Sequence, residues 1–128
     1  MYPEELRYYK EHEWVRTEDA GTAVIGITHF AQEQLGDIVY VDLPEPGAQL
    51  DSLAKIGEIE SVKAVNDLFI PISGEVIEVN GKLKDAPELV NEDPYGEGWM
   101  LRVKVRDAAE IDALMTAKEY EKMVEDAE

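Results

Sequence analysis

Short segments rich in β-branched and aromatic residues, each closed by turn residues, recur along the chain and constrain its fold most. Segments of this length and composition are typical of β-strands. Many short strands joined by turns favour a compact sandwich or a barrel-like β domain. The expected strands are EWVRT (13–17), TAVIGI (22–27), DIVYVDLP (37–44), IGEIESV (56–62), DLFIPIS (67–73), EVIEVN (75–80) and WMLRVKVRD (99–107).

Turn-forming residues separate these strands. The first two strands flank EDAG (18–21), where Gly21 can take a positive φ without strain, so this pattern indicates a hairpin. EPGAQLD (45–51) is expected to form a turn. Residues 81–98 carry Gly, Pro, Asn and Asp at close intervals and are interpreted as an ordered loop.

The last expected strand alternates cleanly and is predicted to be half-buried. One face is apolar and the other is basic. The apolar face contains Trp99, Leu101, Val103 and Val105, and the basic face contains Arg102, Lys104 and Arg106.

Helices are expected at two places. Thr28 is a suitable N-cap for residues 29–35, and Gly36 a suitable C-terminal stop. After about residue 107 the apolar residues recur at helical spacing, and Thr116 with Glu119 forms a capping-box pattern. We therefore predict two short helices with a break between them over about 107–126. The apolar residues of these helices are Ile111, Leu114 and Met115, then Tyr120, Met123 and Val124.

Composition excludes several functions. The chain has 128 residues, which suits one domain, with 12 Lys and Arg against 29 Asp and Glu and a net charge of -17. Such a charge disfavours nucleic acid and anionic membranes as partners and favours basic surfaces on proteins. Without cysteine there are no disulfides, thiolate metal sites or cysteine nucleophiles. The absence of a long apolar run and of a recognisable targeting segment predicts a cytoplasmic protein, or a mitochondrial one if the chain is processed.

Catalytic patterns are weak. His12 and His29 lie in different segments without zinc-ligand spacing, so no metal site is expected. No serine sits in a Gly-flanked nucleophile elbow, and GEG (96–98) is interpreted as a turn rather than a dinucleotide motif. An enzyme is the least supported class.

Lys63 in GEIESVKAVND (57–67) is the main candidate. We expect Asn66 and Asp67 to form the turn of a hairpin, with Lys63 exposed a few residues ahead of it. Glu58 and Glu60 would favour the charged ammonium and so disfavour catalysis by a free amine. Acylation by an enzyme that recognises these carboxylates remains open. From the residues alone, Lys63 is an exposed hairpin lysine.

Around this lysine, ESVKAVNDLFIPISGEVIEVN (60–80) strongly resembles the H protein family of the glycine cleavage system. Other stretches resemble the same family in the same order, so the resemblance covers nearly the whole chain. Biotin carriers usually have methionines beside the lysine, whereas Val62 and Ala64 stand here. The other matching stretches are HEWVR, GIT, QEQLGDIVYVDLPEPG, LVNEDPYGEGWM and KEYEKM.

The resemblance implies a mainly β, barrel-sandwich hybrid like those of lipoyl and biotinyl carriers, with short helices and a helical C-terminal extension. One lipoyl-carrier domain would span 1–128, with its core at about 12–106. Lys63 would be amide-linked to lipoic acid by a lipoate ligase or lipoyl transferase. The residues expected to serve in recognition of this lysine hairpin are Glu58, Glu60, Ser61, Val62 and Ala64.

By the same resemblance, the chain is a carrier and not an enzyme. It would take the aminomethyl group of glycine from the pyridoxal-phosphate-dependent glycine decarboxylase (P protein) to the tetrahydrofolate-dependent aminomethyltransferase (T protein). Dihydrolipoamide dehydrogenase (L protein) would then reoxidise it. A carrier that visits three enzymes is expected to be a monomer.

The resemblance also implies a cleft that protects the loaded arm. Glu13 and Asp67 match positions that hold its amine, and a carboxylate suits a cation. Their alternative interpretation is that they are solvated surface acids. Glu11 stands where some members of the family have a small hydroxyl residue, and His29 stands where an acidic residue is frequent.

Two other functions stay open at this point. A lipoyl relay protein, which passes lipoate to other lipoyl-dependent enzymes, would need the same modified Lys63. An acidic binding domain without lipoate could have kept the fold, although the intact ESVKA stretch (60–64) argues against it.

Overall fold

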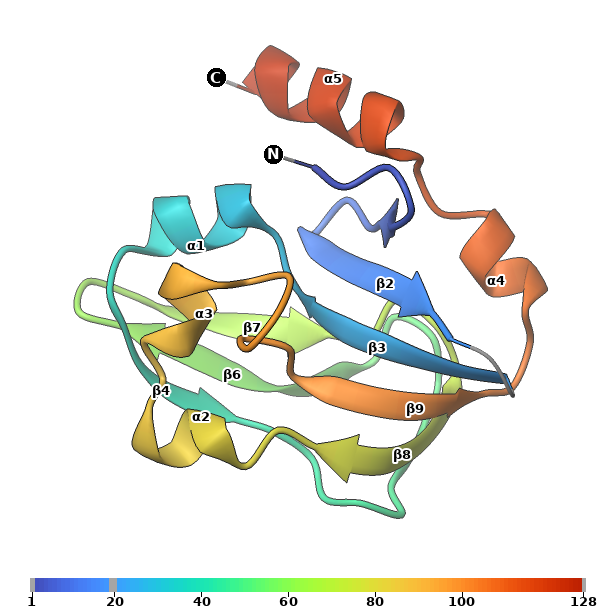
Figure 1. Cartoon of the computed structure of the whole chain (residues 1–128), viewed down its shortest axis with the longest axis horizontal. Helices are drawn as coiled ribbons and strands as arrows, with labels where there is room; N and C mark the ends of the chain where they lie inside the picture. The colour runs from blue at the N-terminus through green and yellow to red at the C-terminus, as the bar shows by residue number, and fades with distance from the viewer. Residues whose placement is uncertain (1, 19–20, 128) are drawn as a thin grey trace.

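The computed structural model describes residues 2–18 and 21–127, which form two antiparallel sheets with short helices at their edges (Figure 1). The larger sheet has six described strands, in the order β1 (Arg7–Tyr8), β2 (Glu13–Thr17), β3 (Thr22–Ile27), β9 (Leu101–Val105), β8 (Gly74–Val79) and β5 (Gln49–Leu50). The smaller sheet has the order β4 (Ile38–Asp42), β6 (Lys55–Ser61) and β7 (Val65–Phe69).

The two sheets enclose one apolar core, which confirms the predicted mainly β barrel-sandwich architecture. Side chains along each strand alternate between the two faces of the sheet, and the apolar ones point inward. In β9 this agrees with the sequence, because Leu101 and Val103 are buried while Lys104 is exposed. The core includes Val15, Ile25, Ile27, Ile38, Val41, Ile59, Leu68, Ile70, Ile72, Val76, Leu101 and Val103.

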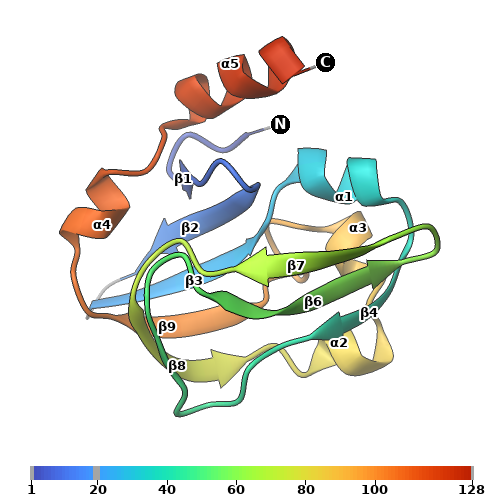
Figure 2. The same ribbon diagram turned by 180° about the vertical axis from the view of Figure 1, so that it is seen from behind.

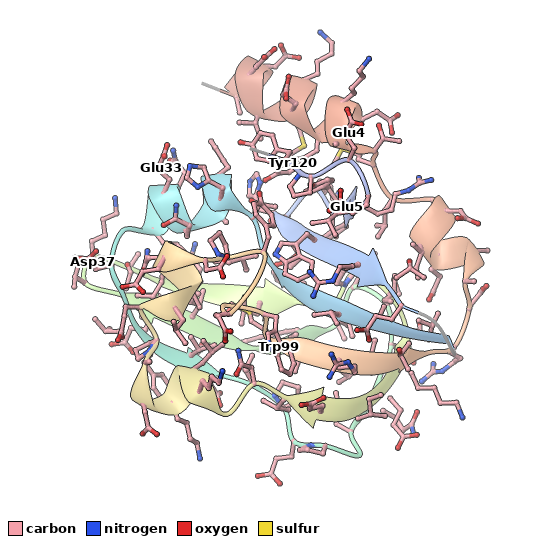
Figure 3. All side chains as sticks on the ribbon, in the orientation of Figure 1. Glu4, Glu5, Glu33, Asp37, Trp99 and Tyr120 are labelled. Carbon is pink, nitrogen blue, oxygen red and sulfur yellow. The ribbon has the colours of Figure 1, made fainter. Side chains whose placement is uncertain are left out.

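A second apolar cluster fixes the N-terminal segment and the last helix to the outside of the larger sheet. Trp14 is fully buried and lies over Gly26, its partner across β2 and β3, where a Cβ would meet the indole ring at 2.6 Å. On the same side Tyr8 stacks on Tyr120 with ring centroids 4.9 Å apart. Figure 3 shows Tyr120 projecting from the last helix toward the N-terminal segment.

The predicted helix caps are confirmed. The Thr28 hydroxyl accepts a hydrogen bond from the Ala31 amide (3.2 Å) at the start of α1 (His29–Leu35), which ends at Gly36 with a φ of 81°. The C-terminal part contains α4 (Ala109–Asp112) and α5 (Ala117–Ala127). At the start of α5 the Thr116 amide donates to Glu119 Oε1 (2.9 Å), and the Glu119 amide donates to Thr116 Oγ1 (3.3 Å).

Several boundaries differ from the expectation. Residues 81–98 are not a loop throughout, because they contain α2 (Lys82–Asp85) and α3 (Leu89–Glu92), which bury Leu83 and Val90 in the core. β5 lies within the turn expected at 45–51. In the EDAG turn Gly21 has the predicted positive φ of 76°, while Asp19 and Ala20 lie outside the described residues.

No helix in the described part of the chain is long and apolar enough to cross a membrane.

Candidate functional site

Lys63 lies at the tip of the β6–β7 hairpin, where it is exposed. The expected turn at Asn66 and Asp67 is wrong, because both residues lie within β7 and pair with Ile59 and Glu58. The chain instead reverses at residues 62–64. This hairpin therefore presents the lysine at its tip rather than on the approach to it.

The side chain of Ser61 closes the turn. Its Oγ accepts hydrogen bonds from the amides of Ala64 (3.1 Å) and Lys63 (3.3 Å), and the Ser61 amide donates to the Ala64 carbonyl at 2.8 Å. Neither Val62 nor Lys63 has a positive φ, so the turn needs no Gly or Asn. Serine hydroxyls often stabilise turns in this way, and here the bonds fix the backbone that carries Lys63.

The segment that follows α1 supports the tip of the hairpin. The Val62 amide donates to the Asp37 carbonyl at 3.0 Å, and Figure 3 shows Asp37 at the end of the molecule where the hairpin turns. The side chain of Lys63 passes over Gly36, since a Cβ on that glycine would lie 3.6 Å from Lys63 Cε. The backbone beside the lysine is thus held while its ammonium group stays accessible.

A cleft of about 240 Å³ lies between α1, the entry to β2 and the β6–β7 hairpin. It contains Glu13 and Asp67 together, although they are far apart in the sequence. It also contains Glu11 but not His29, whose ring instead contacts Glu33 at 3.2 Å. The residues around the cleft are Glu11, His12, Glu13, Ile27, Phe30, Ala31, Gln34, Leu35, Ile59, Asn66, Asp67 and Leu68.

Glu13 is the most unusual group in the cleft. Glu13 is only 3% exposed, and its Oε1 has no hydrogen-bond partner among the described residues. Burial raises the pKa of Glu13, a hydrogen bond from the Phe69 backbone lowers it and the charge of Glu11 raises it, and together they bring the pKa to about 9. A carboxyl group with an unpaired buried oxygen is suited to a ligand that donates a hydrogen bond or carries a positive charge.

Asp67 and its neighbour Asn66 face opposite sides of β7. Asp67 pairs with Glu58, and Lys55 Nζ bridges the two carboxylates at 3.1 and 3.3 Å. Asn66 pairs with Ile59, a core residue, so its side chain is on the cleft side of the strand. Sequence reasoning did not identify Asn66 as a cleft residue, and the alternation of β7 was the signal that could have done so.

The wall of the cleft beside Glu13 is held by hydrogen bonds from distant parts of the chain. The Nδ1 of His12 lies 2.7 Å from the Tyr120 hydroxyl, which is also 2.7 Å from Thr28 Oγ1. His12 has a positive φ of 77°, and its carbonyl accepts from the Thr28 amide at 3.0 Å. Burial lowers the pKa of His12, so the ring is held as a neutral hydrogen-bonding group.

The other hairpin residues that were expected to serve in recognition differ in their solvent exposure. Glu60 and Val62 are exposed, Glu58 and Ala64 are partly exposed, and Ser61 is buried in the turn. Within the described residues no group of three His, Cys, Asp or Glu side chains is placed to hold a metal ion.

Known proteins resemble this chain over most of its length. The family model described as "Glycine cleavage H-protein" matches residues 6–127. The glycine cleavage system H protein of Marinobacter nauticus is 54% identical over 118 residues, which cover 92% of this chain and 91% of the relative. That of Brevibacillus brevis is 54% identical over 125 residues, or 98% of each chain.

A solved structure is similar in fold as well. The crystal structure of a glycine cleavage system H protein from Mycobacterium marinum superposes with a TM-score of 0.88 and is 38% identical. The superposition covers 96% of this chain and 98% of that one.

Proposed function

The chain belongs to the glycine cleavage H-protein family, and on this basis we propose that it carries lipoate on Lys63 in the glycine cleavage system. In this role it takes the aminomethyl group of glycine from the decarboxylase (P protein) to the aminomethyltransferase (T protein). Dihydrolipoamide dehydrogenase (L protein) then reoxidises it. One observation carries the assignment of the site: an exposed lysine at a hairpin tip stands beside a cleft with an unpaired buried carboxyl group.

The hairpin suits the attachment of an acyl group to Lys63. In this step Nζ attacks the carbonyl carbon of an activated lipoyl group, and an amide C–N bond forms as the activating group leaves with its electron pair. The ammonium group gives up two protons in all and loses its charge. The hydrogen bonds of Ser61 and Asp37 hold the backbone, so the enzyme meets a tip of defined shape.

The residues of the cleft fit a lipoyl arm that folds back onto the protein. When bound, lipoate would supply a disulfide that is reduced as one of its sulfurs accepts the aminomethyl group, and the dithiol left after transfer would later be reoxidised. Ile27, Phe30 and Leu35 provide apolar wall, while the Glu13 carboxyl is placed to hold a positively charged amine. Asn66 adds a carboxamide on the same side, whereas the Asp67 carboxylate, which contacts Lys55, points to the other side of β7.

The chain itself is proposed to act as a substrate of other enzymes. Its acidity would speed encounters with basic docking surfaces on the P, T and L proteins and on a lipoate ligase or lipoyl transferase. The rates of the enzymes that use the carrier should then fall as the salt concentration rises. Rates unaffected by salt would contradict electrostatic steering. A monomer in the cytoplasm suits this cycle.

The relay function is not favoured, because the relatives compared above bear the name of the glycine cleavage system. Turnover of glycine decarboxylase discriminates the two functions directly. A modified chain that supports turnover acts in glycine cleavage. A modified chain that fails to support it, but donates lipoate to other enzymes, is a relay protein.

Intact mass with peptide mapping tests the attachment site. The native chain is incubated with a lipoate ligase, lipoate and ATP, and compared with Lys63→Arg and with the matched control Lys55→Arg. We expect one lipoyl adduct on the native chain and on the control, and none on Lys63→Arg. An adduct on another residue, or no adduct on the native chain, would contradict the attachment of lipoate at Lys63.

A further inference from the structure

We propose that Tyr40, Glu60 and Val65 form a docking face for the enzyme that acylates Lys63, so that recognition extends to a strand outside the lysine hairpin. Tyr40 belongs to β4, which the lysine-centred sequence motif does not include. This inference rests on the proposed function, because it concerns the unmodified Lys63 as substrate.

Strand register places the three residues in one row. Tyr40 is directly opposite Glu60 in the β4–β6 pair, and Glu60 is directly opposite Val65 in the β6–β7 pair. Directly opposite residues share a face, and their side chains touch or nearly touch. Val41 and Ile59, the adjacent opposite pair, are buried in the core, so the row faces away from it. Figure 2 shows this sheet toward the viewer.

The row exposes apolar groups that the fold itself does not use. Tyr40 is 53% exposed and Val65 is 57% exposed, and Val62 at the tip is 70% exposed. Single exposed apolar residues are common, but a group of them beside one reactive side chain indicates an interaction surface. The group lies immediately behind Lys63 along the hairpin, where an enzyme that takes the lysine must pass.

A hollow next to Tyr40 extends this surface. It has a volume of about 410 Å³ and lies between the end of β4 and α2. Leu43, Pro44, Val79 and Leu83 contribute apolar wall, with Tyr40 at one side. An apolar side chain of a partner can enter the hollow while the partner covers the Tyr40 ring.

Carboxylates determine what kind of partner fits. A second row of the same face consists of Asp42, Glu58 and Asp67, two residues further from the tip. Lys55 contacts two of these carboxylates and leaves the face with an excess of negative charge. The complementary partner therefore has an apolar contact patch bordered by basic side chains.

The acylating enzyme is the occupant that this position favours. Before modification the reactive atom is Nζ itself, so the enzyme must approach the tip as closely as one lysine side chain allows. The enzymes of the later steps reach a group at the end of a long flexible arm. Contacts directly beside the lysine are consequently required for acylation more than for the later steps.

Three variants test the docking face. Tyr40→Ser and Val65→Thr remove exposed apolar groups from it. Ile77→Thr is the matched control, because Ile77 is 42% exposed on β8 in the other sheet. Calorimetry measures binding of each unmodified chain to a lipoate ligase, and intact mass gives the rate of adduct formation. We expect Kd and KM to rise about tenfold for the two face variants, with kcat changed less than about twofold and Ile77→Thr unchanged.

Tyr40→Phe provides a second variant that keeps the ring and should bind as the native chain does. Native-like Kd and KM for both Tyr40→Ser and Val65→Thr would overturn the docking proposal while leaving Lys63 as the site. Native-like acylation, combined with loss of glycine decarboxylase turnover in the modified variants, would also overturn it and assign the face to the decarboxylase. Failure of the native chain to acquire any adduct would instead contradict the proposed function.

Discussion

The hydroxyl of Tyr120 lies 2.7 Å from Nδ1 of His12, and this contact connects the last helix to the wall of the cleft. The same hydroxyl is 2.7 Å from Thr28 Oγ1, which caps α1, a second element that borders the cleft. Stacking on Tyr8 fixes the ring from which the hydroxyl projects. One side chain of α5 therefore holds two elements that border the cleft.

Tyr120→Phe should lower the free energy of unfolding by about 1–3 kcal/mol, because the change keeps the ring stack but leaves buried polar partners unsatisfied. Urea unfolding at neutral pH measures the effect. Tyr40→Phe is the control, since Tyr40 is exposed, and should change stability by less than about 0.5 kcal/mol. Equal stability of native protein and Tyr120→Phe would show that water replaces the hydroxyl without cost.

Glu13 should make the protein less stable as the pH rises. Burial raises its pKa from 4.5 to about 9, so between these values the folded protein binds more protons than the unfolded chain. The free energy of unfolding then falls with rising pH in this window, and the contribution is a loss on the order of 3 kcal/mol at pH 7. A site that costs stability in this way is typical of a ligand-binding group rather than a structural one.

Glu13→Gln should remove this dependence. Urea unfolding of both proteins at several values between pH 5 and pH 9 should give a difference in stability that grows with pH in favour of Glu13→Gln. Other groups titrate in both proteins, so only the difference reports on Glu13. Parallel curves would mean that the carboxyl group is not buried in a neutral form.

Features that depend on neighbouring residues could be predicted from the sequence. Thr28 and Gly36 limit α1 as expected, and Thr116 with Glu119 begins α5, because a cap is made by side chains within one turn. The alternation of residues 101–105 likewise identified a strand with one buried face. The family resemblance brought Glu13 and Asp67 to attention, and the structure places both around one cleft.

Features that depend on strand pairing could not be predicted in the same way. The turn lies at residues 62–64 and not at Asn66 because the Ser61 hydroxyl and the carbonyl of Asp37, a residue distant in the sequence, accept hydrogen bonds from its backbone. The opposite directions of Asn66 and Asp67 follow from pairing with β6, which fixes the side of the sheet for each residue. The helices at 82–85 and 89–92 form because burial of Leu83 and Val90 outweighs their loop-like composition.

Leu53 should be replaceable with a gain in stability. It adopts a positive φ of 72° although it is 54% exposed, so it bears backbone strain without burying its side chain. Leu53→Asn should raise the free energy of unfolding by roughly 0.5–1 kcal/mol, because asparagine tolerates this conformation better. Thermal and urea unfolding measure the change, with Ile77→Asn as the control for loss of an exposed apolar residue. A loss of stability in Leu53→Asn would show that the leucine packs favourably despite its exposure.

Retention of the aminomethyl group should depend more on Glu13 than on Asp67. Glu13 has an unpaired oxygen inside the cleft, whereas the Asp67 carboxylate is shared with Lys55 on the outer side of β7. The positive charge of the bound amine favours the ionised form of Glu13, so the loaded arm gains a charge-assisted hydrogen bond that a neutral amide cannot form. Glu13→Gln should therefore shorten the half-life of the loaded carrier about tenfold. Asp67→Asn should shorten it less than about threefold, and Asn66→Ala should lie between them because the carboxamide is on the cleft side of the strand.

Mass spectrometry of the loaded carrier over time, without partner enzymes, gives these half-lives. Glu60→Gln is the matched control, because it removes a carboxylate from the same hairpin on the outer face, away from the cleft. Its half-life should equal that of the native chain. If Glu13→Gln also kept the native half-life, neither acid would hold the amine, and the cleft would protect the arm through its apolar wall alone.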